Sequence, residues 1–131
     1  MTDIPVRRRT VGQIIVAALF ALLAANAIEE AIWSDSPPAL RVWQAVVFVL
    51  AGAAAWGAWT GARWSAVLAL LYGVVAGAMV VCLGPMLDMP VEERGGLWVG
   101  GAIVLVIGLV CAWYLRRVTT RAQAASLRDA A

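Results

Sequence analysis

Four apolar stretches follow one another along the chain, with short polar segments between them. They cover residues 11–32, 39–59, 66–83 and 97–115. At about 1.5 Å of helix per residue, each is about long enough to cross a hydrocarbon core roughly 30 Å thick. The pattern predicts an all-α integral membrane protein. We expect a four-helix bundle in one transmembrane domain, residues 1–131, with tails 1–10 and 116–131.

The charged residues predict how this bundle is oriented. Eight of the ten arginines fall on one side of the spans: Arg7, Arg8, Arg9, Arg63, Arg116, Arg117, Arg121 and Arg128. The other side has Arg41 and Arg94 together with six acidic residues: Glu29, Glu30, Asp35, Asp88, Glu92 and Glu93. Because positively charged flanks stay in the cytoplasm, we expect both termini to be cytoplasmic. The basic runs are short and suit topology and anionic headgroups, so we expect no nucleic-acid partner.

The N-terminus admits a second interpretation, a cleaved secretory signal. Arginines 7–9, an apolar run and the triplet Ala25-Asn26-Ala27 imitate such a signal and its cleavage site. The apolar run continues to Ile32 with few polar interruptions, which favours a retained span.

The two loops on the acidic side share a pattern. Asp-x-Pro-x-x-x-Arg occurs at residues 35–41 and again at 88–94. One interpretation is an internal duplication, with two helical hairpins of like orientation related by an axis along the membrane normal. The other is convergence, because an acidic residue before proline is ordinary helix-start chemistry.

Three glycine pairs with four-residue spacing predict where helices pack closely. They are Gly57 with Gly61, Gly73 with Gly77, and Gly96 with Gly100. This spacing puts both glycines of a pair on one helix stripe, where two backbones approach each other. Tryptophans near the span ends, among them Trp43, predict aromatic belts at the membrane boundaries. Tyr72 lies at about mid-depth, where its hydroxyl needs a partner.

Polar residues on the acidic side form the candidate site. The members are Asn26, Glu29, Glu30, Arg41, Gln44, Asp88 and Arg94. Asn26 and Glu30 share a helix face through their four-residue spacing. Three interpretations stay open: a solvated or salt-bridged helix end, a binding site for a cation, proton or cationic substrate, and a partner-docking surface.

The sequence carries no sign of catalysis. It has no histidine and only two cysteines, in different spans, which leaves its serines without an activating base and offers no zinc, haem or iron–sulfur pattern. Phosphate-binding loops, dinucleotide fingerprints and metalloprotease motifs are also missing. We therefore expect a non-enzyme with no catalytic residues, no cofactor and no metal.

The segment Trp56-Gly57-Ala58-Trp59-Thr60-Gly61-Ala62-Arg63-Trp64, followed by Tyr72-Gly73, resembles small four-span bacterial membrane proteins of the DoxX-like type. The resemblance covers about 70 residues in the middle of the chain. It implies a four-helix membrane bundle without an assigned reaction, in the bacterial cytoplasmic (inner) membrane.

These observations favour an accessory or scaffold subunit of a larger membrane complex. Small size, little extramembrane chain and small-residue stripes suit packing against membrane lipid and against other subunits or further copies of the chain. The alternative is a small homo-oligomeric transporter or channel with an outward-facing acidic binding site. A membrane enzyme using the outer carboxylates is the weakest of the three.

Overall fold

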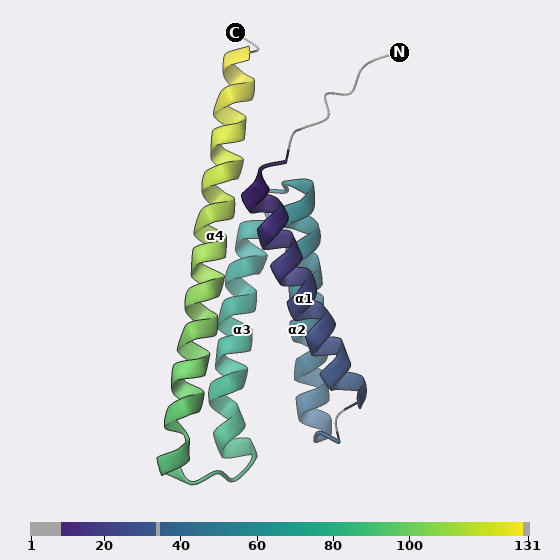
Figure 1. The fold of residues 1–131 in the computed structure, drawn as a ribbon, viewed down its shortest axis with the longest axis vertical. Coiled ribbons are helices and arrows are strands. Elements are labelled where there is room, and N and C mark those ends of the chain that lie inside the picture. Colours follow the sequence, from purple (N-terminus) through teal and green to yellow (C-terminus); the bar gives the residue numbers. More distant parts are fainter. Residues whose placement is uncertain (1–8, 34, 130–131) are drawn as a thin grey trace.

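The computed structural model describes residues 9–33 and 35–129, which form four long helices and one short helical turn (Figure 1). The long helices are α1 (Val11–Trp33), α2 (Pro38–Thr60), α3 (Ser65–Met86) and α4 (Gly95–Asp129), and the turn is η1 (Val91–Glu93). Each long helix is apolar and long enough to cross a membrane. The predicted all-α, four-helix membrane bundle is confirmed. Arg7 and Arg8, used above to predict orientation, lie outside the described residues.

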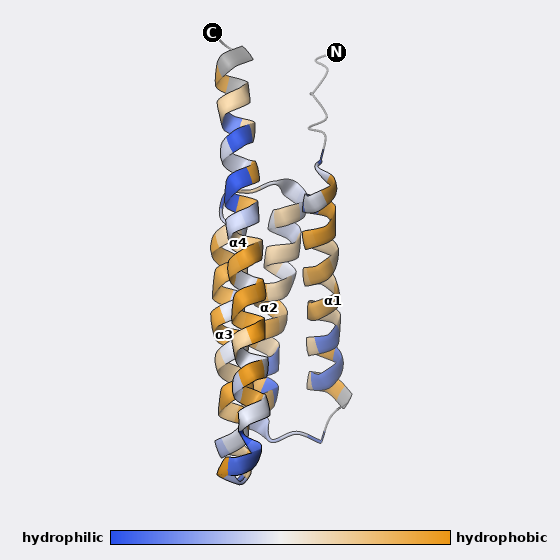
Figure 2. Cartoon of the chain, turned by 60° about the vertical axis from the view of Figure 1, so that its left-hand side comes forward, coloured by the Kyte–Doolittle hydropathy of each residue, from blue (hydrophilic) through white to orange (hydrophobic). Residues whose placement is uncertain are grey.

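The helices pair as two antiparallel hairpins, α1 with α2 and α3 with α4, and α2 packs on α3 to join them. Figure 1 shows the hairpins closer together at the end that carries both termini than at the opposite end. Figure 2 shows an apolar middle with hydrophilic positions toward both ends of the bundle.

Charge distinguishes these two ends, and we name them for it. The arginine-rich end carries Arg9, Arg63, Arg116, Arg117 and Arg121. The acidic end carries Glu29, Glu30, Asp35, Asp88, Glu92 and Glu93, together with Arg41 and Arg94. The assignment of the arginine-rich end to the cytoplasm stays a prediction.

The two Asp-x-Pro segments adopt different local structures. In the first, Pro37 and Pro38 stand at the start of α2, so Arg41 lies in its first turn. In the second, Pro90 precedes the η1 turn, and Arg94 comes before α4 begins at Gly95. The internal duplication therefore stays a prediction, and the shared pattern serves two kinds of helix start.

Glycine 61 ends α2 instead of packing two helices together. Its φ is 69°, and its N–H donates to the Ala58 carbonyl, 3.3 Å away. Glycine favours this left-handed conformation because it has no Cβ. Its predicted partner Gly57 lies under the turn, where an added Cβ would stand 2.8 Å from Ser65 Cβ. The pair thus makes the turn between α2 and α3.

Gly73 and Gly77 do bring two helices together, as their spacing predicts. A Cβ added to Gly73 would lie 2.9 Å from Gly108 Cα, and one added to Gly77 would lie 2.9 Å from the Gly101 carbonyl oxygen. The glycines that α4 contributes are therefore Gly101 and Gly108.

The third predicted pair, Gly96 with Gly100, does not make this close approach. Nothing lies within 4 Å of a Cβ added to Gly96, and one added to Gly100 would be 3.4 Å from Val80 Cγ1, an ordinary contact. The reason is rotational: Gly101 is one residue, or roughly 100°, further around the helix than Gly100.

Helix α4 is longer than its predicted span. The sequence places a tail from residue 116, but the helix continues to Asp129. Figure 1 shows this C-terminal part projecting past the other three helices. In this part the hydroxyls of Thr119 and Thr120 donate to carbonyls one turn earlier, at 2.9 and 2.7 Å.

Candidate binding cavity

A cavity of about 600 Å³ opens between the two hairpins at the acidic end, where they diverge. All four helices contribute to it. Its apolar wall includes Leu23 of α1, Val47 of α2, Met79 of α3 and Val104 of α4. Because the hairpins converge toward the other end, the cavity is the space left by the wedge shape of the bundle.

Three polar side chains meet at this cavity and are joined by hydrogen bonds. Gln44 of α2 donates from Nε2 to Glu30 Oε2 at 2.6 Å, and Asn26 of α1 donates from Nδ2 to Glu30 Oε1 at 3.3 Å. The first bond crosses between the helices of the first hairpin. The second joins neighbouring turns of α1, as their four-residue spacing predicts. Each oxygen of the Glu30 carboxylate therefore has one amide donor.

The charged groups of this cavity are all negative. Asp35, in the loop between α1 and α2, lines the cavity together with Glu30. Among the described residues that form the lining, no arginine is present. A carboxylate offers about four lone-pair directions, and the two amides occupy only two of those on Glu30. The remaining acceptor capacity favours a cation or another strong hydrogen-bond donor.

One of the lining residues, Tyr72, belongs to an aromatic pair. The ring of Tyr72 meets that of Phe20 edge to face, with centroids 5.2 Å apart and planes at 88°. Phe20 is fully buried, and Tyr72 lines the cavity. Within the described part of the chain, the Tyr72 hydroxyl has no hydrogen-bond partner. The partner expected from its mid-depth position is thus missing, and the hydroxyl remains available to a ligand.

The structure brings together three of the seven predicted site residues. Asn26, Glu30 and Gln44 line the cavity, whereas Glu29, Arg41, Asp88 and Arg94 do not. Glu29 and Glu30 are both exposed, but adjacent helical residues diverge by roughly 100°, so only Glu30 reaches the cavity lining. The seven residues therefore do not all line one cavity, and their role in binding stays a prediction.

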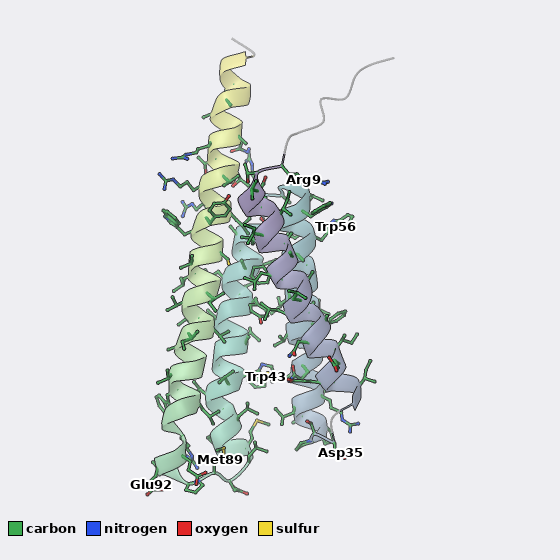
Figure 3. All side chains as sticks on the ribbon, viewed as in Figure 1. Arg9, Asp35, Trp43, Trp56, Met89 and Glu92 are labelled. Carbon is green, nitrogen blue, oxygen red and sulfur yellow. The ribbon has the colours of Figure 1, made fainter. Side chains whose placement is uncertain are left out.

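Two of the excluded residues belong to the loop between α3 and α4. Arg94 donates from Nε to the Met89 carbonyl at 2.9 Å, and its Cγ would lie 3.0 Å from a Cβ on Gly84. Asp88 has a positive φ of 50°. Figure 3 shows Met89 and Glu92 at the end of this hairpin and Asp35 at the end of the other. Arg94 thus stabilises its own loop, and the amides of Asn26 and Gln44 are the donors to Glu30.

Sequence reasoning missed Asp35, Tyr72 and Met79 as members of the site. Two of them carried a signal: Asp35 by its charge in a loop at the acidic end, and Tyr72 by its polar hydroxyl at mid-depth in a span. Trp43 was expected in the aromatic belt, but it is half-buried and packed against the core. Its indole N–H is buried, without a partner among the described residues. Figure 3 labels it between the two hairpins, toward the acidic end.

The cavity has polar acceptors at one end of an apolar space. Within residues 9–33 and 35–129, no three histidine, cysteine, aspartate or glutamate side chains lie close enough together to hold a metal ion. Neither a protein-family model nor a curated protein nor a solved structure matches this chain. The DoxX-like resemblance therefore stays a prediction.

Proposed function

We propose that this multi-pass membrane protein binds a small amphiphilic molecule with a positively charged end, taken up between its hairpins at the acidic end. The observation that carries the proposal is the arrangement of Glu30, with both carboxylate oxygens oriented by amides at an apolar cavity. The proposal develops the acidic binding site of the alternative sequence interpretation.

The size and lining of the cavity support a ligand with an apolar body. Small-molecule sites measure roughly 300–1,000 Å³ and combine apolar walls with a few convergent polar groups. The cavity of about 600 Å³ falls in this range. Its polar groups are at the acidic end, so a bound amphiphile places its charge there and its apolar part against Met79 and Val47.

The packing of the bundle supports binding in preference to conduction. On the other side of the Phe20–Tyr72 pair, α2 and α3 are packed by alanines that have no exposed surface, Ala54, Ala58 and Ala69. A path for an ion across the membrane requires a continuous set of polar groups, which these apolar contacts interrupt. The cavity is thus a site entered from one end.

The experiment measures binding of dodecylammonium, with dodecanol and dodecanoate as uncharged and anionic probes of equal chain length. The purified protein is melted in a zwitterionic detergent, and the affinity follows from the dependence of the melting temperature on ligand concentration. We expect dodecylammonium to bind tightest. Glu30→Gln removes a charge-assisted contact worth about 1.5–3 kcal/mol, so the affinity should fall about 10- to 100-fold.

Glu29→Gln is the matched control, because it removes the same charge from the neighbouring residue outside the cavity. Glu30→Gln should fold, since an amide oxygen still accepts the hydrogen bond from Gln44. Equal losses of affinity in the two variants, or equal binding of the three probes, would contradict the proposal.

An accessory subunit is the second candidate function, and one observation favours it, the projecting end of α4. The last turns of this helix, which ends at Asp129, extend past the rest of the bundle. The segment continues a 35-residue helix and has few neighbours within the chain, so its surface is open to a partner subunit that packs against it.

Native mass spectrometry of the protein, gently purified from its host membrane, tests the accessory role. Stoichiometric association with another subunit, lost on truncation after residue 121, is the expected result. Complete retention of the partner after truncation would contradict docking through this segment.

A further inference from the structure

Two adjacent hollows lie against α4 at the arginine-rich end, opposite to the cavity described above. Their volumes are about 500 and 380 Å³, and both are lined by Trp113, Arg117 and Arg121. The larger hollow also reaches the start of α1, where Thr10 and Gln13 line it. They are thus two parts of one surface, which we call the inner basic surface.

The inner basic surface has positive charge without a counter-charge. Arg116, Arg117 and Arg121 line it, and no carboxylate is among the described residues of either lining. The Arg117 guanidinium carbon lies 5.2 Å from the centre of the Trp113 ring. This cation–π contact holds the guanidinium beside the ring and leaves its planar fork of donors available to an anion.

The start of α1 adds polar groups on the other side of the larger hollow. Thr10 and Gln13 cap the helix reciprocally: the Thr10 N–H donates to Gln13 Oε1 at 3.0 Å, and the Gln13 N–H donates to Thr10 Oγ1 at 3.3 Å. The Thr10 hydroxyl lies 3.4 Å from that of Tyr114 of α4. Two hydroxyls and the positive end of a helix dipole thus face the same hollow as the arginines.

An apolar stripe leads along α4 to these arginines. Val106, Val110, Trp113, Arg117 and Arg121 recur at spacings of three and four residues, which puts them on one helix face. Val106, Val110 and Trp113 are 55%, 57% and 61% exposed, so this face is free along its length. A hydrocarbon chain lying on the valines would bring a group at its polar end to Arg117.

The two arginines nearest to Trp113 lie at the depth of a lipid headgroup layer. From Arg116 to Arg121 the helix rises about 7.5 Å. Each headgroup layer of a bilayer is roughly 5–7 Å thick outside the hydrocarbon core. With Trp113 at the hydrocarbon boundary, as its type favours, Arg116 and Arg117 lie about 4.5 and 6 Å beyond it, at the depth of lipid phosphates. Arg121 lies about 12 Å beyond Trp113, and its long side chain leans back along α4 toward this layer, because helical side chains tilt toward the N-terminus.

The geometry points to a binding site for an anionic phospholipid at the inner basic surface. Its phosphodiester is held by Arg117 and Arg121, and one acyl chain lies on the stripe formed by Val106, Val110 and Trp113. This site is independent of the proposed cavity ligand, since it lies at the other end of the bundle and binds the opposite charge. A soluble phosphate compound has the same headgroup chemistry but no acyl chain that could contact the apolar stripe.

The test is native mass spectrometry of the purified chain in a neutral detergent, titrated with dioleoylphosphatidylglycerol. Dioleoylphosphatidylcholine, with the same acyl chains and a zwitterionic headgroup, is the reference lipid. Attraction of about 1 kcal/mol per arginine predicts a roughly 30-fold weaker affinity for phosphatidylglycerol in Arg117→Gln with Arg121→Gln, and a roughly fivefold loss in Arg121→Gln alone.

Arg63→Gln is the matched control, because Arg63 is exposed at the same end and lines neither hollow. Glutamine forms helix about as well as arginine, and circular dichroism checks that the double variant is folded. If the double variant is not folded, the affinity of Arg121→Gln alone decides the test.

Three results would overturn the proposal. The first is equal affinity for the two lipids, and the second is an unchanged affinity for phosphatidylglycerol in the arginine variants. The third is displacement of the lipid by excess glycerol 3-phosphate, which would assign the surface to a soluble phosphate compound. We expect glycerol 3-phosphate to leave the bound lipid in place.

Discussion

Replacing single glycines by alanine should change the stability of the bundle in opposite directions, depending on what the new methyl group meets. At Gly73 the Cβ would stand 2.9 Å from Gly108 Cα, and at Gly108 it would stand 2.6 Å from Gly73 Cα and 3.0 Å from the Ala69 carbonyl oxygen. These contacts involve backbone atoms, which no rotamer change moves away. The only response is a separation of α3 from α4.

The size of the effect follows from these distances. Carbon atoms prefer separations of about 3.5–4.0 Å, so Gly73→Ala requires the two helices to move apart locally by about 0.6–1.1 Å. Overpacking of this kind costs about 1–3 kcal/mol. Lipid offers no hydrophobic compensation for the lost contacts between the helices. We expect Gly73→Ala to destabilise by about 1–2 kcal/mol and Gly108→Ala by about 2–3 kcal/mol.

Gly52→Ala and Gly96→Ala are the controls, because a Cβ at either position meets nothing within 4 Å. Alanine stabilises a helix by roughly 0.5–1 kcal/mol relative to glycine, so these variants should be neutral or more stable. Gly100→Ala, whose Cβ would make an ordinary 3.4 Å contact with Val80, should be close to neutral.

The assay is reversible unfolding in mixed micelles with increasing dodecyl sulfate, followed by tryptophan fluorescence. The seven tryptophans of the chain provide the signal. Equal midpoints for Gly108→Ala and Gly52→Ala would refute the reasoning, because the close approach of α3 and α4 would then have no energetic consequence.

Two further stability predictions use the same assay. Gly61→Ala should destabilise by about 1–2 kcal/mol because an L-residue is strained at the observed φ of 69°; Gly61→Asn should recover part of this loss, and equal stability of alanine and asparagine there would count against the strain argument. Phe20→Ala should cost about 3–5 kcal/mol, because it removes a fully buried ring from its contact with Tyr72. The half-buried Phe48, replaced in the same way, should cost less, and the reverse order would contradict the assigned core.

The sequence by itself determined the helices and which polar groups share an end. A run of apolar residues interrupted by proline, charge and glycine is a local signal, and its length matches the membrane. With an even number of spans, the termini must lie together, as Figure 1 shows. The link between Asn26 and Glu30 was also predictable, because both belong to the same helix face.

Part of the candidate site could not be predicted from sequence spacing, because its residues come from different helices. Glu30 and Gln44 are 14 residues apart on different helices, and Tyr72 comes from the second hairpin. Sequence spacing could not separate Glu30, which lines the cavity, from Glu29, which does not. That distinction depends on how α1 is rotated about its axis when it packs on α2.

Only the tertiary structure decided which helix faces meet, and therefore where the wedge and its cavity form. The spans are apolar on every side because lipid and helix interior are similarly apolar, so hydrophobic periodicity does not mark the buried face. Small residues mark candidate packing faces, but the sequence contains more of these faces than the structure uses. Gly73 packs against Gly108, whereas Gly96 faces open space, and this choice was made by the fit of two backbones.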